Sequence, residues 1–324
     1  MKAYSTDLSI QLRLTSNNKT PVIAALVANL VVAITKLIVA YFSRSTSVLA
    51  EAVHSLSDTV NQILLLTGIN LSARPPSAKH PFGRGKEQFF WSFLVSLVVF
   101  WVSATFSITQ GLSKIGRPPE ITHLELTVLS LFFIALVEGT ALYITRRNIS
   151  RRVTTLNLEG IRHFFRESKD PVILAAFLED AVALFGVLVA LGGVSLTYVT
   201  GKEFFDAIAA IVIGLALAAY GLILAFESKD LLIGEGISKK EVRQIEDMIR
   251  AMPEVVSVVD VRGIYFGPEK IVLGLEVEFK DGLKTEELES VIDRIERKMK
   301  AMSPKYEHIY VEAEKPEGLR KPSS

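Results

Sequence analysis

The chain contains 324 residues, of which 49% are hydrophobic, and its mean hydropathy of +0.35 is high for a soluble protein. The formal net charge is +1, so the charge balance gives no indication of a nucleic-acid partner. The absence of cysteine excludes disulfides, thiolate metal ligands and cysteine nucleophiles. The N-terminal residues 1–20 are mixed and polar, so we expect no cleaved signal peptide there.

Six stretches are apolar over roughly 20 residues or more, the length needed to cross the hydrocarbon core of a bilayer. They cover residues 21–43, 47–72, 88–112, 122–145, 171–198 and 204–226. The second stretch is the least apolar, because it carries Glu51, His54, Asp58 and Asn61. This composition is typical of a helix that faces the interior of a membrane bundle rather than lipid.

Lysine and arginine in the segments between these stretches predict the orientation in the membrane. The N-terminus, the 73–87 loop and the 146–169 segment together carry 14 such residues, whereas the segments on the opposite side carry 4. Positively charged segments remain on the cytoplasmic side. We therefore expect a multi-pass membrane protein with both termini in the cytoplasm, located in the cell membrane.

After residue 226 the composition changes to that of a soluble domain. The patterns predict, in chain order, a helix from Ser238, strands at 255–265 and 271–279, a helix from Thr285 and a last strand at 306–314. The order α-β-β-α-β favours a small α+β domain, ferredoxin-like, with its helices on one face of a sheet. We therefore divide the chain into a cytoplasmic N-terminal segment, a six-helix transmembrane domain, a linker, a cytoplasmic domain and a tail, at residues 1–20, 21–227, 228–237, 238–316 and 317–324.

His54 and Asp58 lie four residues apart in the second apolar stretch. Residues at this spacing share one face of an α-helix, one turn apart. An imidazole and a carboxylate together offer nitrogen and oxygen ligands to a divalent transition metal. Glu51 lies one turn before His54 and is a further candidate ligand. The alternative is a hydrogen-bonded polar pair that holds neighbouring helices together.

The fifth stretch carries two adjacent acidic residues, Glu179 and Asp180, which are also candidate ligands. Neighbouring residues of an α-helix point about 100° apart, so both carboxylates cannot face one ion squarely. We expect one of them to face the second stretch and the other to bind a proton, water or a neighbouring helix. A buried carboxylate without a partner is unfavourable, and a bound cation relieves that cost. Matched polar residues on two helices therefore favour a metal site between them.

The sequence also contains two longer motifs, SVLAEAVHSLSDTVNQ at Ser47–Gln62 and HPFGRGKEQ at His80–Gln88. Both resemble the cation diffusion facilitator family of metal/proton antiporters, and Lys36 and Asp206 are also similar to the family pattern. The resemblance covers nearly the whole chain, with six spans, cytoplasmic termini and the C-terminal α-β-β-α-β domain. It implies a transport site built from two residues of the second span and two of the fifth.

In that pattern His54 and Asp58 match the first pair, and Asp180 matches one member of the second pair. The other member falls on Ala176, where the family usually has histidine or aspartate. Alanine cannot bind a metal, so the resemblance implies three protein ligands. Glu179, Glu51 or water is then left to complete the site. The Leu-Glu-Asp run that ends at Asp180 resembles that of a subgroup of the family.

The resemblance implies a homodimeric secondary transporter that exports a divalent transition metal from the cytoplasm in exchange for protons. One histidine with carboxylates suits Zn²⁺, although a single nitrogen ligand leaves Mn²⁺, Fe²⁺ and Co²⁺ open. The metal is then a substrate, and no prosthetic group is expected. The alternatives are a non-transporting membrane metal sensor or binding protein, and an intramembrane enzyme. The chain has no HExxH, GxSxG or paired catalytic aspartate motif, so we expect no enzyme.

Overall fold

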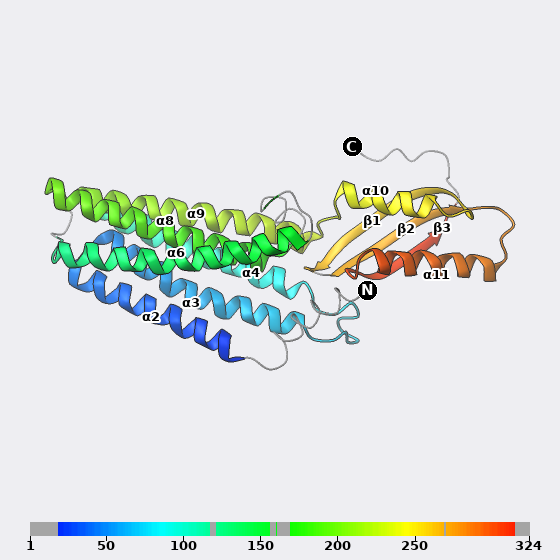
Figure 1. The fold of residues 1–324 in the computed structure, drawn as a ribbon, viewed down its shortest axis with the longest axis horizontal. Coiled ribbons are helices and arrows are strands. Elements are labelled where there is room, and N and C mark those ends of the chain that lie inside the picture. Colours follow the sequence, from blue (N-terminus) through cyan, green and yellow to red (C-terminus); the bar gives the residue numbers. More distant parts are fainter. Residues whose placement is uncertain (1–18, 117–120, 156–159, 161–168, 269, 315–324) are drawn as a thin grey trace.

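The computed structural model describes residues 19–116, 121–155, 160, 169–268 and 270–314. The predicted N-terminal segment 1–20, apart from its last two residues, and the predicted tail 317–324 lie outside these ranges. Figure 1 shows a long bundle of helices at one end of the molecule and a smaller domain of helices and strands at the other.

The bundle consists of long α-helices, one of which is interrupted by a short π-helical segment. Its α-helices are α2 (Lys19–Ser43), α3 (Thr46–Ser72), α4 (Glu87–Val98), α5 (Thr105–Ile115), α6 (Leu124–Thr155), α8 (Pro171–Thr200) and α9 (Phe204–Ile233). A π-helical segment, η1 (Val99–Ala104), joins α4 to α5, so that these three elements form one continuous helix.

Four helical segments within the described residues are long and apolar enough to cross a membrane. They are Glu87–Ile115, Leu124–Arg151, Pro171–Thr200 and Phe204–Ile233. The other two predicted spans fall on α2, which contributes the shorter apolar helix Asn29–Ser43, and on α3, which has 27 residues but buries many polar side chains. The helical membrane domain predicted from the sequence is therefore confirmed, with four of its helices meeting the length and hydropathy expected of a span.

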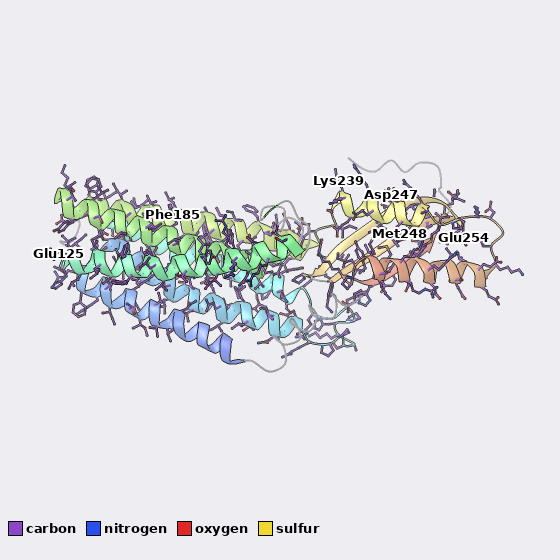
Figure 2. The ribbon with its side chains drawn as sticks, in the orientation of Figure 1. Glu125, Phe185, Lys239, Asp247, Met248 and Glu254 are labelled. Carbon is purple, nitrogen blue, oxygen red and sulfur yellow. The ribbon has the colours of Figure 1, made fainter. Side chains whose placement is uncertain are left out.

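The outer surface of the bundle is apolar. Large side chains are exposed on it, such as Trp101 at 66% and Phe185 at 45%, and Figure 2 shows Phe185 on the outside of the helices. Polar side chains lie inside instead, because Lys36, Glu51 and His54 are all fully buried. Soluble monomers rarely expose a contiguous apolar surface of this extent, whereas intramembrane ionisable residues face the bundle interior.

The helix ends follow from local sequence. Ser45 precedes α3, and its side chain accepts a hydrogen bond from the backbone N–H of Val48. Asp170 caps α8 in the same way, with Pro171 in the first turn. Gly201 ends α8 with a φ of 65°, a left-handed conformation that favours glycine. These caps set where each helix begins and ends relative to its neighbours.

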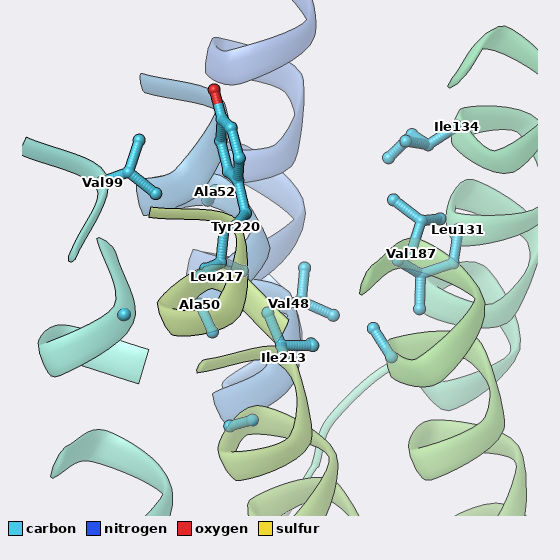
Figure 3. Close-up of a cluster of buried hydrophobic side chains, with 14 of the residues drawn as sticks. Val48, Ala50, Ala52, Val99, Leu131, Ile134, Val187, Ile213, Leu217 and Tyr220 are labelled. Atoms are coloured by element: carbon cyan, nitrogen blue, oxygen red, sulfur yellow. The ribbon is translucent and has the colours of Figure 1, made fainter. Parts of the chain in front are cut away.

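The core of the bundle brings α3 against α9. Val48, Ala50 and Ala52 of α3 belong to one buried cluster with Leu217 and Tyr220 of α9 (Figure 3). Small side chains on α3 let the two helices approach closely, as is common in membrane bundles. The polar residues of α3 are therefore held in a close-packed environment.

The C-terminal domain contains the elements that the sequence predicts, in the predicted order. They are α10 (Lys239–Arg250), β1 (Val255–Gly267), β2 (Lys270–Phe279), α11 (Thr285–Met302) and β3 (Tyr306–Ala313). The sheet order is β1-β2-β3, with β1 antiparallel and β3 parallel to β2. Leu273 and Leu275 on one face of β2 share a core with Ile245 of α10 and Ile295 of α11, so both helices cover the same face.

The loop that follows α3 contacts this domain. The ring of Phe82 lies 5.8 Å from that of Phe266 on β1 and 5.1 Å from that of His308 on β3. Lys86 Nζ donates a hydrogen bond to the carbonyl of Leu232 at 3.2 Å, near the end of α9. The helix that carries His54 is therefore connected to the C-terminal domain through packed side chains as well as through the chain.

Candidate functional site

His54 and Asp58 lie together inside the bundle, as the spacing on α3 predicts. His54 is fully buried and Asp58 is 6% exposed. Nδ1 of His54 lies 3.2 Å from Oδ1 of Asp58, but this contact lacks the geometry of a hydrogen bond. Within the described part of the chain neither ring nitrogen of His54 has a hydrogen-bond partner. Two buried ligand atoms that face each other without a donor between them are suited to hold a cation.

The carboxylate of α8 that approaches this pair is that of Glu179. Glu179 is 7% exposed, accepts a hydrogen bond from Gln62 Nε2 of α3 at 3.5 Å, and is close enough to Asp58 for the two to repel each other. Asp180 instead accepts a hydrogen bond of 2.5 Å from the Thr145 hydroxyl of α6. The adjacent acids thus contact different helices, as the 100° rotation between neighbours predicts.

The burial pattern of α8 agrees with this division. Ala175, Glu179 and Ala183 are buried at spacings of four residues and form the inner face of the helix. Ala176 is exposed, and Asp180 is only half-buried. These two residues, which are also four apart, therefore do not belong to the buried inner face of α8. Ala176, which the resemblance implies as a ligand position, therefore lies on a different side of α8 from Glu179.

Glu51, the further candidate on α3, is part of an ion-pair network. Lys36 Nζ of α2 donates hydrogen bonds to Glu51 Oε2 at 3.2 Å and to Glu138 Oε1 of α6 at 2.9 Å. Lys36 and Glu51 are both fully buried. The other oxygen of Glu51 lies against Gly186 of α8, where a Cβ would overlap it. The network therefore ties α2, α3 and α6 together and occupies one oxygen of Glu51.

The start of α3 is anchored by Asp206, near the start of α9. Its carboxylate accepts hydrogen bonds from the backbone N–H groups of Thr46 and Ser47 and from the hydroxyls of Ser45 and Ser47. Asp206 is 1% exposed. An acidic side chain at a helix N-terminus is favourable because the exposed N–H groups carry partial positive charge. This contact fixes the position of α3 along the bundle.

Sequence reasoning missed several polar neighbours of the site. Tyr220 of α9 is 1% exposed, its hydroxyl lies 3.5 Å from the carbonyl oxygen of Ala175, and the ring is close enough to Glu179 and Asp58 to be affected by their charges. Between residues 207 and 225 Tyr220 is the only residue that is neither aliphatic nor glycine, and this is the sequence signal that could have identified it. The contact between Gln62 and Glu179 was not predictable, because spacing along one helix does not show which neighbouring helix a side chain contacts.

A second group of acidic residues lies on the C-terminal domain. Carboxylate oxygens of Glu276, Glu312 and Glu314 come within 4.8 Å of one another, and two of the three residues are exposed. Arg262 lies 3.5 Å from Glu276, and a hydrogen bond to Asp260 raises the pKa of its guanidinium group. The group is therefore partly neutralised and open to water, unlike the buried pair of His54 and Asp58.

Comparisons with known proteins identify both halves of the chain. The model of the cation efflux transmembrane domain matches residues 22–233, and the model of the cation efflux protein cytoplasmic domain matches residues 237–316. The chain is 25% identical over 308 residues to the mitochondrial proton-coupled zinc antiporter SLC30A9 of Homo sapiens, covering 84% of this chain and 54% of that protein. It is 28% identical over 258 residues to metal tolerance protein C4 of Arabidopsis thaliana, covering 80% and 56%.

A third relative is the manganese efflux system protein MneP of Bacillus subtilis, 26% identical over 249 residues that cover 76% of this chain and 79% of that protein. The chain spans about half the length of the zinc antiporter and metal tolerance relatives that it matches. The transmembrane model covers well over half of the chain, and four of its helices have the length and hydropathy of membrane spans. The chain is therefore an integral membrane protein and belongs to the cation diffusion facilitator family.

Proposed function

We propose that this protein is a secondary transporter that exports a divalent transition metal from the cytoplasm in exchange for protons, with Zn²⁺ as the first candidate. The observation that carries the proposal is the buried His54–Asp58 pair of α3 facing the Glu179 carboxylate of α8. Buried ionisable groups that lie near one another inside an apolar bundle are unfavourable without a cation. Membership of a transporter family supports transport rather than an enzymatic reaction.

The ligand set that we propose contains His54, Asp58 and Glu179. Asp180, which the family pattern implies, serves in this proposal to position α8 through its hydrogen bond with Thr145. Glu51 is assigned to the ion pair with Lys36, because one of its oxygens is already bound there. Such pairing leaves one imidazole nitrogen and two carboxylates for the ion, a set that suits zinc.

Exchange with protons follows from the chemistry of these ligands. A metal binds neutral imidazole and ionised carboxylates, so that loading the site releases protons and protonation of the same groups expels the ion. The protons and the metal thus compete for His54, Asp58 and Glu179. In this proposal a proton gradient directed into the cytoplasm drives metal out of it.

The remaining expectations belong to the same proposal. We propose six membrane spans, with α2 and α3 completing the four apolar helices, and both termini in the cytoplasm at the cell membrane. We also propose the domain division at residues 21–227 and 238–316, a ferredoxin-like arrangement of the C-terminal domain and a homodimer. The match of residues 237–316 to the cytoplasmic domain of cation efflux proteins supports the last two points. Lipid, protons and the metal ion are then the other partners.

Manganese is the second candidate substrate. One relative is named as a zinc antiporter and another as a manganese efflux protein, and a site with a single nitrogen ligand suits either ion. The alternative outside the transporters is a membrane metal sensor that does not transport. Tight metal binding without metal flux would identify it.

Purified protein in lipid vesicles that contain a metal-sensitive dye tests the proposal. We expect uptake of Zn²⁺ or Mn²⁺ from a panel of divalent ions, and loss of that uptake in His54→Ala and Asp58→Ala. Ser57→Ala is the matched control, because Ser57 is also buried on α3 but donates to the carbonyl of Val53 in its own helix. Transport at the wild-type rate by either ligand variant would contradict the assigned site.

A further inference from the structure

We propose that Asn61 supplies an amide-oxygen ligand to the transported ion and thereby replaces the ligand that the family usually places at the position of Ala176. This inference rests on the proposed function, because it adds a member to the same site. The inference gives a residue of α3 a role in ion selectivity. This residue is not among the two ligands of the second span and the two of the fifth span that the resemblance implies.

The position of Asn61 on α3 is the first argument. Asn61 follows Asp58 by three residues and His54 by seven, and residues at these spacings share one face of an α-helix. The next residue, Gln62, is rotated by about 100° from it, and its side chain reaches Glu179 of α8. Asn61 therefore belongs to the same line of side chains as the two proposed ligands on α3.

The lack of a protein partner is the second argument. Asn61 is 0% exposed, and within the described residues neither its amide oxygen nor its amide nitrogen has a hydrogen-bond partner. An asparagine that only holds helices together would bond to a neighbouring helix, as Gln62 bonds to Glu179. A buried amide without a partner is unfavourable, whereas an aliphatic side chain of similar size would avoid the cost. The amide is thus suited to a ligand that lies outside the protein chain.

The geometry of α8 is the third argument. Ala176 is exposed, so the usual fourth ligand position does not reach the site from that helix. With Asn61 the site has four protein ligands, three from α3 and one from α8. The amide oxygen is neutral and does not titrate near neutral pH, so it adds a ligand without adding a proton to the exchange.

The ligand set then predicts ion preference. One imidazole nitrogen, two carboxylates and one amide oxygen form a harder set than one with two histidines, and carbonyl oxygens suit Mn²⁺ better than they suit Zn²⁺. We therefore expect the protein to bind Mn²⁺ within about tenfold of Zn²⁺, and we expect Asn61 to be responsible for that narrow difference.

Two variants of Asn61 test the inference in purified full-length protein. Asn61→Leu keeps the approximate size and removes the ligand, and we expect it to weaken Mn²⁺ binding by about 10- to 100-fold and Zn²⁺ binding less, measured by calorimetry. Asn61→His should raise the number of imidazoles around bound Zn²⁺ from one to two, measured by X-ray absorption spectroscopy. Ser57→Ala is again the matched control and should change neither quantity.

The outcomes separate this inference from the proposed function. If His54→Ala binds metal as the wild type does, the proposed site itself is wrong. If His54→Ala loses binding while Asn61→Leu keeps the wild-type Zn²⁺ and Mn²⁺ affinities, only the role of Asn61 is refuted. Should Asn61→Leu fail to fold, the absorption spectrum of Asn61→His decides, because a single imidazole around its bound Zn²⁺ would refute the inference.

Discussion

The two adjacent acids of α8 provide the sharpest prediction about the site. Glu179→Gln should abolish transport, whereas Asp180→Asn should retain it at a reduced rate. Glu179 is buried on the inner face and meets α3, while Asp180 bonds to Thr145 of α6. The family pattern alone predicts the opposite ranking, because Asp180 is the residue that matches its ligand position.

The expected magnitudes follow from these contacts. Two opposite unit charges 4 Å apart attract by about 4 kcal/mol at an effective dielectric constant of 20. Part of that is offset by desolvation, so we expect Glu179→Gln to weaken metal binding at least about 100-fold, or roughly 3 kcal/mol. Asp180→Asn keeps an oxygen that can accept from Thr145, and exchanging a charged for a neutral hydrogen bond costs about 1 kcal/mol, or roughly fivefold.

Calorimetry at fixed pH measures the affinities, and the dye-loaded vesicle assay measures the flux. Thr145→Val is the control, because removing the donor should have an effect similar to that of Asp180→Asn and the double variant should show little further loss. A larger loss of affinity in Asp180→Asn than in Glu179→Gln would refute the orientation of α8 on which the ligand set depends.

Three further predictions concern residues around the site. Lys36→Met should lower the free energy of unfolding by about 3–5 kcal/mol in thermal denaturation, since it leaves the buried Glu51 and the half-buried Glu138 without their partner; a variant as stable as the wild type would argue against the ion-pair network. Asp206→Ala removes the shared acceptor at the start of α3 and should cost about 1–3 kcal/mol in the same measurement, with an unchanged melting temperature as the contrary result. Ala176→His should leave Zn²⁺ affinity unchanged because the position is exposed, and tighter binding would restore the four-ligand family geometry.

The fold was predictable where the sequence has a clear period or a clear cap. The apolar stretches gave the helices of the bundle, and the capping box at Ser238 and the alternation through β2 gave the elements of the C-terminal domain. The sixth apolar stretch ends at residue 226, whereas helix α9 continues to Ile233 through residues 227–233, which are mixed in composition. Composition marks where a membrane span ends, whereas the backbone hydrogen bonds of a helix can continue beyond it.

The sequence predicts which site residues share a face of one helix, but not which residues of different helices meet. The spacing of His54 and Asp58 on α3 is local, so a four-residue rule was enough to bring them together. The choice between Glu179 and Asp180 depends on how α8 is rotated, and that helix is so apolar on all sides that its sequence shows no preferred face. The partner of Glu51 was equally hidden, because Lys36 lies on another helix and contacts at such sequence separation leave no periodic signal.

In the proposed mechanism, metal and protons exchange through the site formed by His54, Asp58 and Glu179. The most direct measurement follows the pH inside protein-containing vesicles while a Zn²⁺ or Mn²⁺ gradient is imposed and no pH gradient is present at the start. We expect metal entry to drive protons out of the vesicles, so that the internal pH rises, and we expect His54→Ala to abolish both movements together. Metal entry without any change of internal pH, or a pH change that persists in His54→Ala, would refute metal/proton exchange at this site.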